Sequence, residues 1–238
     1  MTSSIASLKN DVSPAEWEAR VNLAAAYRLT ALFGWDDLVF THISARVPGP
    51  EHHFLINPYG MMFDEITASS LVKIDLDGRK VSESPYDVNP AGFTIHSAIH
   101  AAREDAFCVM HTHSPYASAF GVLYEAIPMV LSDSALCLGG RVPVAPYCRS
   151  GTAEFAEEVV KALGMGSAVI WGNHGAMVVG TNLALTFSTA HALEDSAKVY
   201  AIAKQMGTPV LLPADEVAAL RAFWLEHYGQ KPLGEAAG

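Results

Sequence analysis

The sequence has few cysteines, few basic residues and no long uninterrupted apolar stretch. No apolar run reaches the roughly 18 residues that a membrane-spanning helix requires, and the first residues show no basic segment followed by an apolar block. We therefore expect neither a membrane span nor a secretory signal. The three cysteines are odd in number and lack CxxC spacing, which favours reduced thiols in a cytoplasmic protein over a disulfide framework.

Negative charge predominates in the composition. The 238 residues include 15 Lys and Arg against 25 Asp and Glu, a formal net charge of −10, and the basic residues form no cluster. Such a chain is poorly suited to a phosphate backbone, so we expect no nucleic-acid partner. Half of the residues are hydrophobic and 17% are charged, which allows a large buried core and argues against disorder.

No internal repeat, linker or low-complexity segment divides the chain. Its length predicts a single domain over residues 1–238, with loose tails at 1–12 and 230–238. Hydrophobic spacing predicts helices near residues 14–33, 93–103, 115–121, 153–163, 184–206 and 214–228. Strands are expected near residues 38–47, 54–56, 72–76, 107–110, 127–131, 168–171 and 176–179. Hairpin signals such as the Asp77-Gly78 turn favour largely antiparallel strands.

The first helix has well-defined end signals. Ser13 suits the N-cap, Pro14 the first helical position, and Glu16 would complete a capping box. Gly34 can end this helix in a left-handed conformation.

The histidines are the most informative residues. His111 and His113 stand two residues apart at the end of a predicted strand, so both side chains lie on one face of the sheet. His174 lies in a glycine-flanked turn between two predicted strands, where the backbone can approach closely. Three neutral imidazoles around one divalent ion would leave open coordination positions, as in catalytic zinc sites. The alternatives are an ordinary polar strand end and a simple Asn-His-Gly turn.

Several motifs follow one another in a distinctive order. They are Phe33-Gly34-Trp35, Thr41-His42-Ile43-Ser44-Ala45-Arg46, Leu55-Ile56-Asn57-Pro58, Ile66-Thr67-Ala68-Ser69-Ser70-Leu71-Val72-Lys73, Asn89-Pro90-Ala91-Gly92, Val109-Met110-His111-Thr112-His113-Ser114-Pro115 and Asn173-His174-Gly175. With them the chain resembles the class II aldolase/adducin family over roughly residues 15–225, and more closely its adducin-like branch. The resemblance implies an α/β fold, a three-layer α/β/α sandwich with a mostly antiparallel central sheet. It also implies a homotetramer with active sites at subunit interfaces.

In the family's sugar-phosphate enzymes three histidines hold a divalent ion. The resemblance assigns this role to His111, His113 and His174, with zinc expected and manganese, cobalt or iron also compatible with imidazole ligands. Those enzymes carry an acidic residue four positions before a helix histidine, but counting back from His96 gives Gly92. With neutral ligands alone the ion keeps its full +2 charge, which favours a chelating anionic substrate.

The turns that bind phosphate in those enzymes are also altered, because Tyr59 and Phe93 are bulky. We therefore expect a non-phosphorylated organic acid as substrate. The predicted substrate-binding residues are Asn57, Tyr59, Gly60, Gly92, Phe93 and Tyr116.

Acid–base catalysis has several candidates. The predicted catalytic residues are His42, Tyr147 and His191, with Glu194 close to His191 on the same helix. A strand histidine with a satisfied hydrogen bond is the alternative for His42. His96 and His100 share one helix face, and we favour a structural role for His100.

These features predict a metal-dependent lyase. It would break a carbon–carbon bond of a chelating hydroxy, keto or aromatic acid, by retro-aldol cleavage or decarboxylation, through a metal-stabilised enolate. One alternative is a non-haem Fe(II) oxygenase on the same fold. Another is a non-catalytic interaction module like the adducin head domain, which has this fold but lacks the metal histidines.

Overall fold

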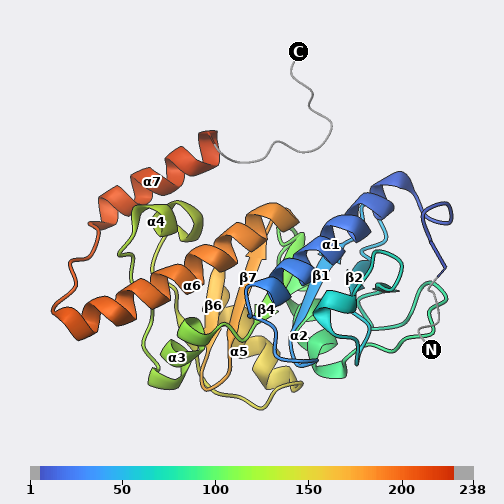
Figure 1. Ribbon diagram of the computed structural model, residues 1–238, viewed down its shortest axis with the longest axis horizontal. Coiled ribbons are helices and arrows are strands. Elements are labelled where there is room, and N and C mark those ends of the chain that lie inside the picture. Colours follow the sequence, from blue (N-terminus) through green and yellow to red (C-terminus); the bar gives the residue numbers. More distant parts are fainter. Residues whose placement is uncertain (1–5, 228–238) are drawn as a thin grey trace.

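A computed structural model describes residues 6–227 of the chain, apart from the side chain of residue 91. A seven-stranded sheet forms its centre, in the order β3-β2-β1-β4-β7-β6-β5 (Figure 1). The strands are β1 (His42–Arg46), β2 (Phe54–Ile56), β3 (Val72–Ile74), β4 (Cys108–Thr112), β5 (Val144–Ala145), β6 (Ala168–Trp171) and β7 (Ala176–Gly180). All neighbouring strands are antiparallel except β5 and β6, which run parallel. The sheet is therefore mixed and mostly antiparallel, as predicted.

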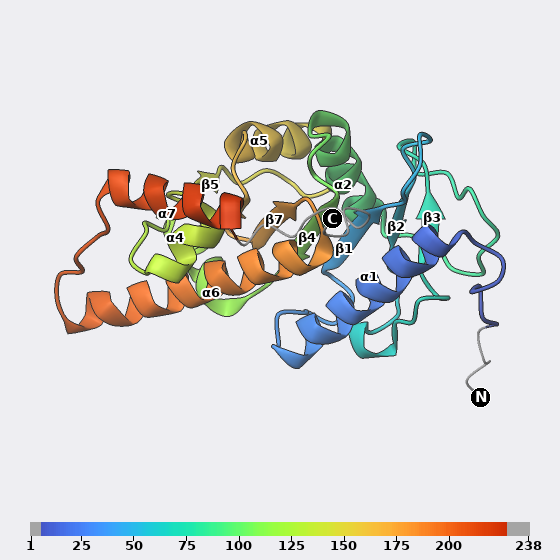
Figure 2. The same ribbon diagram turned by 90° about the horizontal axis from the view of Figure 1, so that it is seen from above.

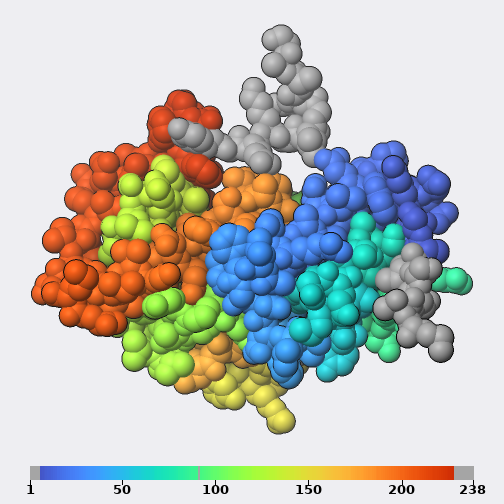
Figure 3. All heavy atoms as spheres, viewed as in Figure 1, coloured from blue at the N-terminus to red at the C-terminus, as the bar shows by residue number. Residues whose placement is uncertain are grey.

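Helices cover both faces of the sheet (Figure 2). On one side lie α2 (Pro90–Ala102) and α5 (Ala153–Leu163). On the other side are α1 (Pro14–Leu32), α3 (Pro115–Leu123), α4 (Ser132–Leu138), α6 (Leu183–Met206) and α7 (Ala214–His227), with a short 3₁₀ turn η1 (Phe63–Glu65). Figure 3 shows the surfaces of α1 (blue) and α6 (orange) side by side on this face. The predicted three-layer α/β/α sandwich is confirmed.

The two faces of the sheet have separate cores because strand side chains alternate. On β4, Met110 belongs to the core beneath α1 and α6, whereas Val109 packs with Ile95 and Ile99 of α2. His111 has the same parity as Val109, so it faces the α2 and α5 layer. None of the described helices is long and apolar enough to cross a membrane.

The start of α1 differs from the prediction in one respect. Ser13 Oγ accepts from the Glu16 N–H at 3.2 Å, and Gly34 takes a left-handed φ of 68° at the far end. The Glu16 carboxylate, however, pairs with Arg20 at 2.9 Å and Lys73 at 2.8 Å. The capping box is therefore half formed, because two cations hold this carboxylate.

Some predicted elements are shorter or absent. The strand expected at 38–47 begins only at His42, and the strand expected at 127–131 is reduced to a single bridge between Ile127 and Val142. Helix α4 and strand β5 were not predicted, since seven and two residues are too few to display a period. Residues 1–5 and 230–238 of the predicted tails lie outside the described residues, whereas Leu8 donates its N–H to Ser69 Oγ at 3.1 Å.

Candidate metal centre

The sheet topology brings the predicted metal ligands together. Strand β4 lies between β1 and β7, with His42 directly opposite His111 and Thr112 opposite Ala176. His113 follows β4, and His174 lies in the turn just before β7, so both reach the same end of the sheet. The ligand atoms of His111, His113 and His174 all lie within 4.8 Å of one another.

Each of these imidazoles uses Nδ1 in a hydrogen bond that points away from the shared centre. His111 Nδ1 lies 2.9 Å from the carbonyl oxygen of Ala176, and His113 Nδ1 lies 2.9 Å from Asp37 Oδ2. His174 Nδ1 lies 3.3 Å from Ser150 Oγ. A carbonyl or carboxylate can only accept, so the proton sits on Nδ1 of His111 and His113, leaving Nε2 as a bare lone pair.

The donor set fits a divalent ion. His111 Nε2 and His113 Nε2 are 3.2 Å apart, and two lone pairs at that distance repel unless a cation lies between them. Tetrahedral coordination at about 2.0–2.1 Å would place two nitrogen ligands roughly 3.3 Å apart. Metal-bound histidines usually donate the other ring N–H to a carboxylate or carbonyl, which is the pattern seen here.

Burial keeps two of the three imidazoles, those of His111 and His174, in the neutral form that can bind a metal. Desolvation lowers the pKa of His111 well below its usual value and lowers the pKa of His174 to about 4, with the neighbouring imidazoles contributing. Both rings are therefore neutral at physiological pH, so no proton competes for the ligand positions. Within residues 6–227 the cluster contains imidazoles alone, because the Asp37 carboxylate contacts the outer nitrogen of His113.

Two glycines permit the close approach of the rings. A Cβ at Gly175 would lie 2.5 Å from the Thr112 carbonyl oxygen and 2.7 Å from His113 Cδ2. A Cβ at Gly92 would lie 2.7 Å from Cδ2 of His42. The imidazole of His42 thus fills the space beside the helix position where the resemblance leads one to expect an acid.

Aromatic rings line the inner side of the centre. The Trp171 indole stacks on His111 with ring centroids 4.1 Å apart, and the Phe155 ring meets the Trp171 indole edge-on at 4.7 Å. The His42 ring lies 4.9 Å from that of His111. His42 therefore belongs to the site, with its Nδ1 bonded to His96 at 2.8 Å.

The turn residues predicted to bind substrate lie in different surroundings. Asn57 is buried, and its Oδ1 accepts from the Tyr27 hydroxyl at 2.9 Å, so its amide is engaged inside the protein. Tyr59 and Gly60 form an exposed turn after β2, with Gly60 at a φ of 87°. The structure shows no contact between this turn and the histidine trio in the described residues.

The aromatic residues Phe93 and Tyr116 have contacts within the fold. Phe93 packs on the small core formed by β2 and β3 and lies under Gly78, so it serves packing. Tyr116 begins α3, and its ring faces Lys198 of α6 at 5.9 Å. Glu194 accepts the N–H groups of Tyr116 and Ala117 at 2.9 Å, which makes it a cap for α3.

The remaining catalytic candidates, His191 and Tyr147, contact residues other than the trio. His191 lies on α6 in an aromatic cluster, with its ring 5.5 Å from that of Phe33 and 5.9 Å from that of Trp35. Tyr147 follows β5, and its side chain is 61% exposed while its N–H donates to the Tyr124 hydroxyl at 3.2 Å. The structure therefore leaves His42 as the acid–base candidate in contact with the trio.

Sequence reasoning missed the groups that orient the trio. Asp37 is separated from His113 by 76 positions, and its one signal is its place just after the Phe33-Gly34-Trp35 motif. Ser150 precedes α5 and shows no signal of its own.

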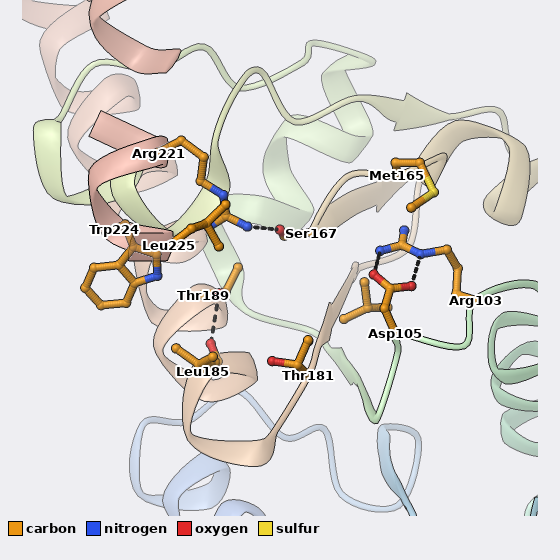
Figure 4. A pocket seen from close by; sticks show the side chains of 12 residues that line it. Arg103, Asp105, Met165, Ser167, Thr181, Leu185, Thr189, Arg221, Trp224 and Leu225 are labelled. Atoms are coloured by element: carbon orange, nitrogen blue, oxygen red, sulfur yellow. Dashed lines mark hydrogen bonds and ion pairs between the residues drawn. The ribbon is translucent and has the colours of Figure 1, made fainter. Parts of the chain in front are cut away.

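Away from the histidines, a pocket is lined by the turn before β6, the end of β7 and residues of α6 and α7 (Figure 4). It holds about 140 Å³ and includes Arg103 and Arg221. Arg103 is paired with Asp105 at 2.6 Å, and Arg221 donates to the carbonyls of Leu136 and Cys137. Both guanidinium groups already have partners within the fold, so this pocket offers no free cation for an acidic substrate among the described residues.

Comparison with known proteins agrees with this geometry. The Class II Aldolase and Adducin N-terminal domain matches residues 21–201. A Caulobacter vibrioides protein with a provisional class 2 aldolase name is 50% identical, covering 89% of this chain and 82% of that protein. Alpha-adducin of Rattus norvegicus is 43% identical, covering 73% of this chain and 24% of that protein.

Solved structures show the same fold. The aldolase II superfamily protein from Pseudomonas syringae has a TM-score of 0.85 and 40% identity, covering 95% of this chain and 91% of that chain. An L-fuculose 1-phosphate aldolase from Glaciozyma antarctica has a TM-score of 0.78 and 29% identity, covering 93% of this chain and 86% of that chain.

Proposed function

The chain belongs to the Class II Aldolase and Adducin family, and from this premise we propose that it is a divalent-metal-dependent lyase. It cleaves a carbon–carbon bond of a non-phosphorylated hydroxy, keto or aromatic acid that chelates the ion. One observation carries the proposal: the imidazoles of His111, His113 and His174 converge within 4.8 Å and direct their Nδ1 atoms outward.

In this proposal His111, His113 and His174 hold the ion through Nε2. A bound divalent ion would polarise a substrate carbonyl and stabilise negative charge that develops on its oxygen. The three ligands are neutral, so a substrate with its own anionic oxygens is favoured over an uncharged one. Asp37 keeps the His113 ring in the orientation that ligation requires.

His42 is the proposed general base. It lies opposite His111, and its Nε2 is on the side of Gly92, where no acidic side chain stands. During retro-aldol cleavage Nε2 would take the proton of the substrate hydroxyl. The electron pair of the breaking carbon–carbon bond would remain on the carbon next to the carbonyl, and the imidazolium would then return its proton to that carbon.

We also propose that the protein acts in the cytoplasm as a homotetramer with sites at subunit interfaces. Beside Asp37, the apolar side chains of Phe33, Leu38 and Phe40 are 45%, 59% and 57% exposed. A neighbouring subunit would cover such side chains and enclose the substrate. Light scattering of the purified protein measures the assembly, and a monomer would contradict this part.

The test combines metal analysis with a substrate screen. Protein purified without chelators should contain about one zinc, manganese, cobalt or iron ion per chain. Hydroxy-keto acids and aromatic carboxylates are then supplied with each metal, and aldehyde, carbon dioxide and oxygen uptake are measured. His113→Ala should abolish turnover and metal binding, whereas His53→Ala, in the loop before β2, should retain both. Oxygen uptake in place of aldehyde or carbon dioxide release would favour an oxygenase.

The similarity to alpha-adducin supports a second candidate, a non-catalytic interaction module. The two candidates differ in their metal requirement. A protein that binds no metal, and gains no activity from any metal, would favour the module over the lyase.

A further inference from the structure

A continuous chain of hydrogen bonds leads away from the metal centre beneath α2. His42 Nδ1 lies 2.8 Å from His96 Nε2, and His96 Nδ1 lies 2.5 Å from Ser44 Oγ. Ser44 Oγ lies 2.8 Å from His100 Nε2, and His100 Nδ1 lies 3.0 Å from the Ala106 carbonyl oxygen. The four side chains come from β1 and α2, and all are at most 4% exposed.

The direction of every hydrogen bond follows from the last one. The Ala106 carbonyl can only accept, so His100 carries its proton on Nδ1 and leaves Nε2 as an acceptor. The Ser44 hydroxyl must then donate to His100 and accept from His96 Nδ1–H. His96 Nε2 is consequently an acceptor, and the proton of this bond belongs to His42 Nδ1.

This assignment requires neutral rings, and the surroundings make them so. No carboxylate is bonded to His42, His96 or His100 within the described residues. Desolvation lowers the pKa of His100 to about 3 and that of His96 well below its usual value. A positive charge on His96 or His100, which lie deeper among the buried groups, would cost more than any hydrogen bond there returns.

We propose that His96, Ser44 and His100 are positioning residues that fix the tautomer of His42, so that its Nε2 presents a lone pair to the substrate. The backbone carbonyl of Ala106 thereby sets the protonation pattern of a ring four hydrogen bonds away. That the lone pair acts on a substrate rests on the proposed function, whereas the tautomer of His42 depends only on the hydrogen bonds through His96, Ser44 and His100.

This series of hydrogen bonds orients His42 and does not conduct protons away from it. A relay would need a final group that releases or accepts a proton, and the Ala106 carbonyl does neither. When His42 takes a proton on Nε2, its Nδ1–H can remain bonded to His96, and no other bond in the chain has to change. Nothing has to reorganise when the base acts, which is the condition for a preorganised site.

Nuclear magnetic resonance of histidine ring nitrogens measures the tautomer directly. In zinc-loaded protein labelled with ¹⁵N-histidine, we expect His42, His96 and His100 each to show a protonated Nδ1 and a bare Nε2. In Ser44→Ala we expect His42 to lose this single tautomer, while His100 keeps its bond to Ala106. Ser134→Ala is the matched control, because Ser134 is an equally buried serine bonded to the Ala192 carbonyl.

Kinetics add an independent measurement once a substrate is known. Ser44→Ala should lower kcat by about 10- to 100-fold with little change in KM or metal affinity. Ser44→Thr keeps a hydroxyl and should restore both the tautomer and kcat. Thermal unfolding of each variant establishes that it is folded.

The outcomes separate this inference from the proposed function. A proton on His42 Nε2 in the wild-type protein, or an unchanged tautomer in folded Ser44→Ala, would overturn the inference whatever the activity. The expected tautomers in a protein that turns over no substrate would uphold the inference and contradict the lyase.

Discussion

Replacing Gly92 by alanine tests whether the position of His42 matters for activity. The new Cβ would lie 2.7 Å from His42 Cδ2, 2.9 Å from Cγ and 3.1 Å from Nε2, whereas ordinary contact begins at 3.4 Å. The ring must therefore move by about 0.7 Å, the difference between 3.4 Å and 2.7 Å. It is held by His96 at 2.8 Å and packs against His111, so this movement strains one of those contacts.

The expected cost divides between stability and activity. Overpacking of a buried site costs about 1–3 kcal/mol. Alanine is the better helix former by about 1 kcal/mol, so Gly92→Ala should lose only about 0–2 kcal/mol of stability. A catalytic group misplaced by nearly 1 Å costs on the order of 100-fold in rate. Metal affinity should stay the same, because the outer partners of the trio are untouched.

The assay compares kcat/KM, bound metal and chemical denaturation of Gly92→Ala with those of Gly140→Ala. An added Cβ at Gly140 meets nothing within 4 Å, so that variant should behave as wild type. Full activity of Gly92→Ala, with the His42 ring signals unchanged, would refute the argument that this glycine exists to accommodate a working His42.

Four further predictions follow from the same geometry. Asp37→Asn should weaken zinc binding by about 10- to 100-fold, since it removes the charge that His113 Nδ1–H meets; equal affinity in competition with a chelator would contradict it. Zinc at 100 times its Kd should stabilise the apoprotein by about 2.7 kcal/mol in thermal unfolding, and should not stabilise His113→Ala. Burial lowers the folded-state pKa of His42 and of His100 to about 3, so the unfolded protein binds more protons than the folded protein between pH 6.5 and 3. The free energy of unfolding should therefore fall as the pH falls, by about 2 kcal/mol at pH 5 for each of these histidines. Denaturation of the metal-free protein at pH 5 and pH 8 measures this difference. Zinc should also alter the fluorescence of Trp171, which stacks on His111, and a spectrum insensitive to zinc would count against ligation there.

The three candidate metal ligands could be selected from the sequence because part of their signal is local. Strand alternation places His111 and His113 on one face, and a glycine-flanked turn allows His174 to approach them. Both patterns act within a few residues, but the meeting of His174 with the other two depends on the pairing of β4 with β7, which the resemblance implied and spacing alone left open. The three-layer architecture came from the resemblance, since periodicity alone indicated only helices with largely antiparallel strands.

The rest of the site depends on pairing between distant segments. Ser44 and His100 are 56 positions apart, and nothing in either sequence context indicates that one hydroxyl bridges two histidines. The packing of Phe93 was not predicted for a similar reason: bulk beside a motif suggested a substrate wall, whereas the partly buried ring packs on the small core of β2 and β3. Side-chain direction in a helix start is set by packing, which local spacing does not encode.

The absence of an acidic side chain at position 92 is linked to the position of the His42 ring. Any side chain at position 92 would clash with the His42 ring where it now stands, because a Cβ there comes within 2.7 Å of it. In the proposed function a neutral base, His42, would stand where the resemblance leads one to expect a charged one. A carboxylate needs no partner to define its protonation state at neutral pH, whereas a neutral imidazole has two tautomers and only one of them presents a lone pair at Nε2. A protein that uses His42 in place of the acid must fix the tautomer of His42. The buried hydrogen bonds through His96, Ser44 and His100 fix it, because each of them has one direction.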